Sequence, residues 1–240
     1  MRLLVMLFTC VVSQACCCQE IITVSRTPLQ DGGIAEVITN NSSIAVTSID
    51  LHIRCNQRGE MRFYIDSLLS STGNTSISPR SSHTVRIPSE YGKCGVGELA
   101  VLFADGSSFG SSEAVKSLHT RRQAYTDELT LLRPIIRDTA DGIQSSASFR
   151  EKIEARHNTV THDVSRDFDE KIGRTFALHS TVKQFFTESQ SDFPSTTSFS
   201  MEYHDGDTSS SADSHHRAIH TIKWLNARQE ALQKAESNGL

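Results

Sequence analysis

Histidines are the residues whose type and spacing come nearest to a chemical site in this chain, because eight of the ten lie after residue 112. His216 and His220 are four positions apart, which places two imidazoles on one face of a helix, where both can bind one metal ion. The residues that would complete such a site are His204, Asp205, Asp207 and His215. Two facing ligands do not hold an ion by themselves, so we predict no metal site and expect solvated histidines here.

The other polar residues do not form a sequence pattern that is typical of an enzyme. His157, His162 and Asp163 have residue types found in catalytic triads, but we recognise no nucleophile elbow to accompany them. The zinc-peptidase sequence H-E-x-x-H and the phosphate-binding P-loop sequence are absent. We therefore predict a protein that is not an enzyme and binds no cofactor. The alternative is a metal-dependent hydrolase with a histidine-based site in the helical region, using His157, His162 or residues 215–220.

Two of the six cysteines lie well inside the chain. Cys55 follows a predicted strand at residues 44–54, and Cys94 precedes a strand that starts near residue 96. If these strands are antiparallel neighbours, the end of one meets the start of the other and the two sulfurs come within bonding range. We predict a Cys55–Cys94 disulfide, worth about 3 to 4 kcal/mol in an oxidising compartment. The alternative is two unpaired buried thiols.

The first fifteen residues predict a signal peptide. Arg2 supplies positive charge, residues 3–12 form a short apolar run, and residues 13–15 place small side chains before a cleavage point. The run is shorter than the roughly twenty residues that cross a bilayer as a helix. Residues 13–16 resemble a bacterial lipobox, although Ser13 stands where leucine is usual. Lipidation of Cys16 and simple cleavage both remain open, and we expect a secreted, periplasmic or cell-envelope protein.

In the first half of the chain, side chains at alternate positions have the same character, a period of two. The faces of the strand at residues 44–54 are Ala45, Thr47, Ile49, Leu51 and Ile53, against Val46, Ser48, Asp50, His52 and Arg54. Such alternation predicts a half-buried strand with one core face and one wet face. Six further strands are expected at residues 21–25, 36–39, 60–66, 83–87, 96–104 and 107–110. Residues 19–111 thus predict a β-sandwich domain.

The turn NNSS at residues 40–43, the strand IAVTSIDLHI and the later AVLFADGSSFG resemble a loose group of uncharacterised secreted bacterial Ig-like proteins. The resemblance covers residues 20–120 and implies an Ig-like β-sandwich without implying a ligand. The chain departs from true immunoglobulin domains, because its predicted disulfide would join neighbouring strands and its single tryptophan is Trp224. The expected fold is an all-β Ig-like sandwich followed by an α-helical C-terminal extension, α+β overall.

The period changes to three and four after residue 111, so residues 112–188 predict a helical region. Ser112 is the expected N-cap of a long amphipathic helix that Pro134 should kink or end early. A second helical zone covers residues 143–188, with Gly173 weakening its middle. Its apolar stripe, which includes Phe168, predicts packing against the first helix or the sandwich, with a partner groove as the alternative.

Residues 189–214 are dominated by Ser, Thr and Asp and predict a disordered linker. Helix formers return at residues 215–237 around Trp224, which predicts a last helix. Two roles stay open for this helix. It docks back on the protein, or it is a detachable segment that binds a partner.

The charge balance excludes a basic nucleic-acid binder, since the net charge is −4. We expect a non-enzymatic interaction or structural module of the cell envelope, with an unknown protein partner there and with or without a lipid anchor. Asn40, Asn41 and Asn74 each begin a glycosylation acceptor sequence, which matters only in a eukaryote. In a bacterium we expect these sequences to be turns.

Overall fold

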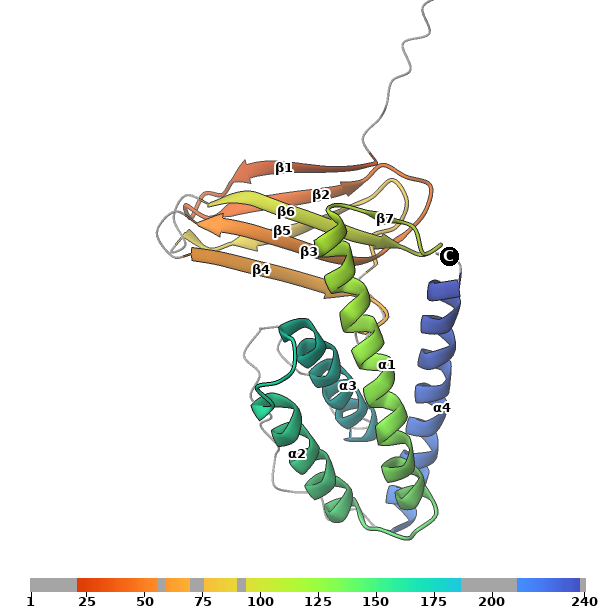
Figure 1. Cartoon of the computed structure of the whole chain (residues 1–240). Coiled ribbons are helices and arrows are strands. Elements are labelled where there is room, and N and C mark those ends of the chain that lie inside the picture. The colour runs from red at the N-terminus through yellow and green to blue at the C-terminus, as the bar shows by residue number, and fades with distance from the viewer. Residues whose placement is uncertain (1–20, 56–58, 70–75, 90–93, 187–210, 238–240) are drawn as a thin grey trace, which may run out of the picture.

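The computed structural model describes residues 21–55, 59–69, 76–89, 94–186 and 211–237. Within them, seven strands in two antiparallel sheets precede four helices, which confirms an α+β architecture (Figure 1). The strands are β1 (Ile22–Pro28), β2 (Ile34–Asn40), β3 (Val46–Cys55), β4 (Gly59–Asp66), β5 (Ser82–Ile87), β6 (Cys94–Phe103) and β7 (Ser108–Phe109). The first sheet has the order β1-β2-β5 and the second the order β4-β3-β6-β7.

The two sheets share one hydrophobic core, to which both contribute alternate side chains. Strand β3 lies at its centre, because Leu51 is the register partner of Phe63 in β4 and of Leu99 in β6. The buried members of this core are Ile22, Ile38, Val46, Ile49, Leu51, Ile53, Ile77, Val85, Ile87, Cys94, Val101 and Phe103. The predicted core face at Ile49, Leu51 and Ile53 is confirmed.

The opposite face of β3 was predicted to be wet, and this prediction is wrong in the first half of the strand. A register shift between Val46 and Ser48 turns Val46 into the core between the sheets. Ser48 and Asp50 are each only 1% exposed. The same face of β6 carries Ala100 and Leu102, which pack against the first helix. Polar residues at alternate positions here therefore face protein and not solvent.

The turn after β2 is built around the buried side chain of Asn40. Its Nδ2 donates to the carbonyl oxygens of Ile44 at 2.8 Å and of Ile77 and Ser78 at 3.2 Å each. Its Oδ1 accepts from the backbone N–H of Ser42 at 3.0 Å. The asparagine thus satisfies backbone groups of two separate segments and fixes the entry to β3, as predicted for a turn residue.

The helices are α1 (Ser112–Ala140), α2 (Ser146–His162), α3 (Phe168–Phe186) and α4 (Ser211–Ser237). Ser111, one residue earlier than predicted, is the N-cap of α1, and its side chain accepts from the N–H of Ala114 at 3.2 Å. Pro134 neither ends α1 nor separates it into two helices. Leu132 and Ile136 on either side of it are fully buried, and this packing holds the helix together despite the lost backbone bond.

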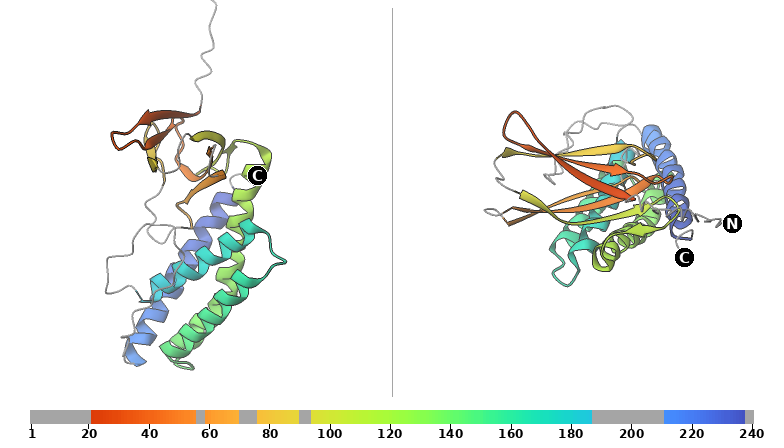
Figure 2. Two further views of the ribbon diagram at one scale, coloured as in Figure 1. Left: turned by 90° about the vertical axis from the view of Figure 1, so that its left-hand side faces the viewer. Right: turned by 90° about the horizontal axis from the view of Figure 1, so that it is seen from above.

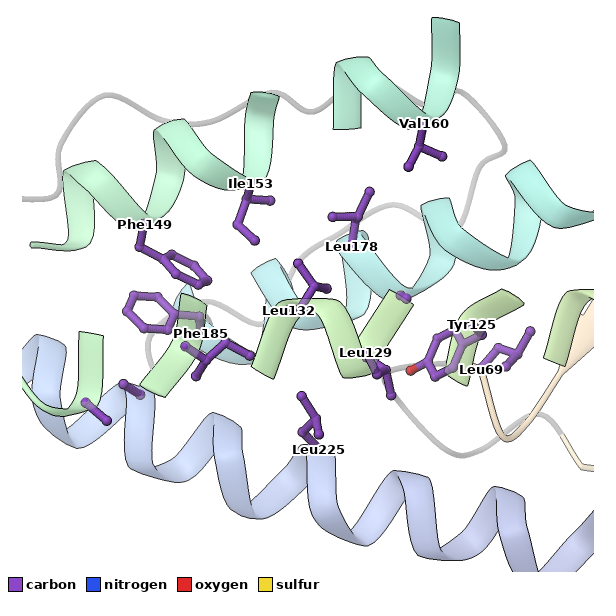
Figure 3. Packing of buried hydrophobic residues seen from close by; sticks show 14 of the residues in the cluster. Leu69, Tyr125, Leu129, Leu132, Phe149, Ile153, Val160, Leu178, Phe185 and Leu225 are labelled. Atoms are coloured by element: carbon purple, nitrogen blue, oxygen red, sulfur yellow. The ribbon is translucent and has the colours of Figure 1, made fainter. Parts of the chain in front are cut away.

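The four helices form a bundle that extends from one side of the sheets (Figures 1 and 2). Its core includes the stacked rings of Phe149 and Phe185, whose centroids are 4.2 Å apart (Figure 3). From α4, the side chains of Ala218, Leu225 and Leu232 are buried in the same core, so the last helix docks back. This helix starts at Ser211, four residues before its predicted start, while residues 189–210 of the predicted linker lie outside the described residues.

The close crossing of α1 and α3 requires a glycine. A Cβ atom on Gly173 would lie 2.2 Å from the carbonyl oxygen of Arg121 and 3.0 Å from the Cβ of Ala124. Real Cβ atoms do not approach backbone oxygens so closely, so any side chain here forces the helices apart. Gly173 therefore serves packing, whereas the sequence suggested only a weak point in the helix.

Replacing Gly173 by alanine is expected to destabilise the protein by about 1 to 3 kcal/mol, because overpacking displaces α3 from α1. Urea unfolding measures the change in the free energy of unfolding. Gly95→Ala is the matched control, since a Cβ at Gly95 meets nothing within 4 Å. Similar losses in the two variants would contradict the crossing as the cause.

Candidate functional site

Arg121 of α1 is the centre of a charge network buried where the helices meet the second sheet. Its side chain is 0% exposed, and its Nη2 lies 3.0 Å from Oδ2 of Asp50, which is also 0% exposed. Its Nε donates to Oδ1 of Asp169 in α3 at 2.7 Å. Its guanidinium carbon lies 4.2 Å from the ring centroid of Tyr64 in β4, a cation–π contact. One side chain of α1 thus contacts β3, β4 and α3.

Arg62 of β4 closes the network on the sheet side. Its Nε lies 2.8 and 3.0 Å from the two carboxylate oxygens of Asp50, and its Nη1 lies 3.3 Å from Oδ1 of Asp169. Burial opposes the charge of Arg62, but the hydrogen bond and negative charge of Asp50 outweigh it and raise the pKa of Arg62. We call Asp50, Arg62, Arg121 and Asp169 the junction network, in which two positive and two negative charges cancel.

Tyr64 connects the junction network to apolar packing. Its ring lies edge-on to that of Phe176 in α3, with centroids 5.9 Å apart. Burial first, and then the negative charge of Asp66, raise the pKa of Tyr64 well above its usual value. The hydroxyl therefore stays protonated and donates to Oδ2 of Asp66 at 3.3 Å.

A second ion pair joins the same helix to the same sheet one position further along. The Nε of Arg122 donates to Oδ2 of Asp66 at 2.8 Å, and its Nη2 donates to Oγ1 of Thr47 at 2.8 Å. The Thr47 hydroxyl in turn donates to the carbonyl oxygen of Leu102 at 3.2 Å. The side chains of Arg122, Asp66 and Thr47 thus find hydrogen-bond partners on different elements.

A third cluster holds three helices together inside the bundle. Glu128 of α1 is 0% exposed and accepts from Nε and Nη2 of Arg156 in α2 at 2.6 and 2.8 Å. It also accepts from Nη1 of Arg174 in α3 at 2.9 Å. The Nε of Arg174 donates to Glu170 at 3.1 Å. Such bidentate pairs have a fixed geometry, so they set helix orientation as well as proximity.

These clusters position elements and provide no reacting group that we can identify. The carboxylates of Asp50, Asp66 and Glu128 each bind an arginine that also contacts another side chain. Neutralising one of these buried carboxylates would leave its arginine without a counter-charge and destabilise the fold. The arrangement therefore suits a structural interface better than proton transfer. These residues were not identified from the sequence, because charged side chains in amphipathic elements usually indicate solvent.

The C-terminal histidines contact neighbouring helices. His215 bonds to the carbonyl oxygen of Ala140 through Nδ1, and Nδ1 of His220 lies 2.9 Å from Nε2 of Gln184 in α3. His216 is exposed on α4. In the described ranges, no three His, Cys, Asp or Glu residues are grouped so that they could hold a metal ion. His204, Asp205 and Asp207 lie outside those ranges.

The other candidate histidines belong to α2. His162 bonds through Nδ1 to the carbonyl oxygen of Asn158 at 2.9 Å. His157 stacks against His179 of α3, with centroids 5.9 Å apart and ring planes inclined by 12°. Burial lowers the pKa of His157, aided by His162, and lowers that of His179 to about 4, aided by His157. Asp163 binds Arg166 at 2.8 Å and shapes the turn after α2.

A serine pattern that was overlooked in the sequence also falls in the described chain. Residues 106–110 read G-x-S-x-G, with Ser108 at its centre. Ser108 is exposed on the two-residue edge strand β7, opposite Leu102 of β6. None of the hydrogen bonds found in the described residues joins a histidine to Ser108.

One hollow lies on the outer face of α1 and the start of α3. Its volume is about 450 Å³, and it is lined by His119, Thr120, Gln123, Ala124, Asp127 and Glu170. Asp127 accepts from Gln123 at 2.8 Å, and Glu170 accepts from Arg166 at 2.6 Å. Both carboxylates of the hollow are thus already bound by neighbouring side chains.

The predicted disulfide partners occupy opposite positions on two neighbouring strands. Cys55 at the end of β3 and Cys94 at the start of β6 are Cα partners in the antiparallel register. Opposite residues in such a pair have Cα atoms about 4.5 to 5.5 Å apart, within the range that a disulfide spans. The bond itself stays a prediction. Cys16 and the predicted signal peptide at residues 1–15 lie outside the described residues.

Comparisons with protein-family models, curated proteins and solved structures found no match for this chain. The described helices include none with both the length and the apolar character that a membrane-spanning segment requires. A function for this chain therefore has to be inferred from the arrangement of its own residues.

Asparagine in place of Asp50 is expected to lower the free energy of unfolding by about 3 to 5 kcal/mol, because Arg121 and Arg62 lose a buried counter-charge. Urea titration measures the loss. Asp31→Asn is the control, since Asp31 pairs with Arg86 on the surface, where their side chains are 52% and 67% exposed. Were both variants to unfold at the wild-type urea concentration, the junction network would not hold the helices on the sheet.

Proposed function

We propose that this chain is an exported, non-enzymatic module in which the sheets and the bundle act as one rigid piece that presents an interaction surface. The observation that carries the proposal is the buried junction network together with α1. Arg121 is bound to β3 and α3, and α1 itself continues from the sheet into the bundle. A rigid joint of this kind suits a spacer or scaffold, because it fixes the direction in which the bundle projects.

The double-sheet portion is proposed to be an Ig-like sandwich. Seven strands distributed as β1-β2-β5 and β4-β3-β6-β7 support this, since Ig-like sheets combine the third, sixth and seventh strands in one layer. The fourth strand lies beside the third here, as an added strand does in variable-type domains. The proposed relationship to secreted bacterial Ig-like proteins rests on this order and on the sequence resemblance.

Export is proposed from the N-terminal sequence and from the cysteines. The register of Cys55 and Cys94 suits a disulfide between neighbouring strands, and such bonds persist in oxidising compartments. Lipidation of Cys16 would attach the rigid piece to a membrane surface, whereas cleavage alone would release it.

The interaction surface is proposed to lie on the helical portion. Five of the eight large hydrophobic side chains that are exposed in the described chain belong to it: Leu131, Ile143, Val164, Phe168 and Ile219. Val164, in the turn between α2 and α3, is 94% exposed. Apolar side chains that become buried at a contact anchor many protein–protein interfaces, and we propose that role for these five.

A photoreactive amino acid at Val164 or Ile219 is expected to capture a protein partner in the cell envelope, because these positions lie on the proposed surface. The control position is Thr84 on β5, which is exposed on the first sheet and away from the bundle. Cross-linked products are identified by mass spectrometry. Capture from Thr84 alone, or from none of the three positions, would contradict the assignment of the surface.

Intact-mass measurement and non-reduced peptide mapping of the mature protein test export and the disulfide. We expect a chain without residues 1–15 and a linked pair of peptides that contain Cys55 and Cys94. An added acyl mass at Cys16 would distinguish an anchored from a released form. Cys94→Ser is expected to lower the free energy of unfolding by about 3 to 4 kcal/mol. A mature chain that keeps residues 1–15 and free thiols at both positions would disprove this part of the proposal.

A further inference from the structure

Two histidines from facing helices contact each other at the interface between α2 and α3. The rings of His157 and His179 lie nearly parallel, with centroids 5.9 Å apart. The Nε2 atom of His157 is buried and has no hydrogen-bond partner in the described part of the chain. Val160 and Leu178, one to three positions away on the same helices, are fully buried in the bundle core. The pair is therefore placed where charge is unfavourable.

We propose that the His157–His179 contact keeps α2 on the bundle only while both rings are neutral, so that acidification releases α2 from α3. Two imidazolium ions at this separation repel each other, and each loses part of its hydration in the interface. Neutral rings have neither cost and contribute their stacking contact. The contact is thus a pH-sensitive latch between two helices.

Charged groups within five positions of the two rings include Arg156 and His162 on α2 and Lys183 on α3, and Glu128 of α1 is bound to Arg156. His162 acts directly on His157 and lowers its pKa, so its own protonation adds to the repulsion. Arg156 is bound to the buried Glu128, which remains as the polar attachment of α2 to α1. The charges of these groups contribute to the electrostatic potential at the two histidine rings.

The direction of the pH effect is determined by the lowered pKa values. In the released state both rings titrate near the ordinary value of about 6.5. In the closed state burial lowers the pKa of His157 and lowers that of His179 to about 4. Released α2 therefore binds protons first as the pH falls. Stability from the closed contact is complete above about pH 6.5 and is lost between about pH 6.5 and pH 4.

Release of α2 would expose apolar surface that the bundle otherwise covers. Phe149, Ile153 and Val160 are the fully buried residues of α2, and Phe149 stacks on Phe185 of α3. Figure 3 shows the two rings facing each other, so separation of the helices would uncover both. An acidic environment would thereby raise the population of an opened bundle with an exposed hydrophobic face.

Hydrogen exchange of the full chain, measured by mass spectrometry at pH 7.5 and pH 5.0 and corrected for intrinsic rates, tests the latch. The titration of His179 alone is expected to raise the opening of α2 about 30-fold at pH 5.0, with α1 protected at both pH values. The double variant H157Q/H179Q is expected to lose this acid response. H83Q is expected to keep it, because His83 also has a lowered pKa but lies on β5.

Equal protection of α1 and α2 in the wild type at pH 5.0 would overturn the proposal, as would an acid response that survives in H157Q/H179Q or disappears in H83Q. If the double variant does not fold, an NMR titration of the histidine rings in the wild type decides. Midpoints below 6.5 for both rings, with faster exchange of α2 amides in the same pH range, support the latch. Ordinary midpoints, or α2 amide exchange that does not respond to pH after correction for intrinsic rates, overturn it.

Discussion

A charge removed from water needs a counter-charge beside it, and this constraint decides how the helices lie on the sheet. Arg121 and Asp50 are both fully buried, so each prevents the other from being an uncompensated charge. Asp169 completes the group from α3, so β3, α1 and α3 are joined through the side chain of Arg121. Apolar burial supplies most of the stability on either side, and we attribute the unique orientation of the two parts to the ion pairs.

A single helix belongs to both cores. Ala114 and Leu118 near the start of α1 pack on β6, whereas Leu129 and Ile136 further along belong to the bundle. With a rise of about 1.5 Å per residue, the 29 residues of α1 extend about 43 Å, so the far end of the bundle stands well away from the sheets (Figure 1). The continuous backbone of α1 and the junction network thus both fix the helical bundle relative to the sheets.

Local patterns were predictable from the sequence and long-range partners were not. The alternation at Ile49, Leu51 and Ile53 identified a core face, because a period of two needs no knowledge of the rest of the chain. The same alternation made Asp50 look solvent-exposed, since a carboxylate bound to a distant arginine and one bound to water leave the same pattern. Gly173 likewise acquires its meaning only from the neighbouring helix. The junction network was not predicted from the sequence, because its members are recognised only by their partners on distant elements.

Asn40 has a consequence for how the protein can be produced. Its amide nitrogen already donates to carbonyl oxygens, and Oγ of Ser42, the third residue of the same acceptor sequence, donates to Oδ1 of Asn40 at 2.7 Å. Attachment of an oligosaccharide by a eukaryotic secretory host would replace one of the two hydrogens on that nitrogen and place a sugar where Asn40 is fully buried, which excludes the native turn. Sugar and fold are alternatives at this position, so a bacterial expression host is the appropriate source of native material.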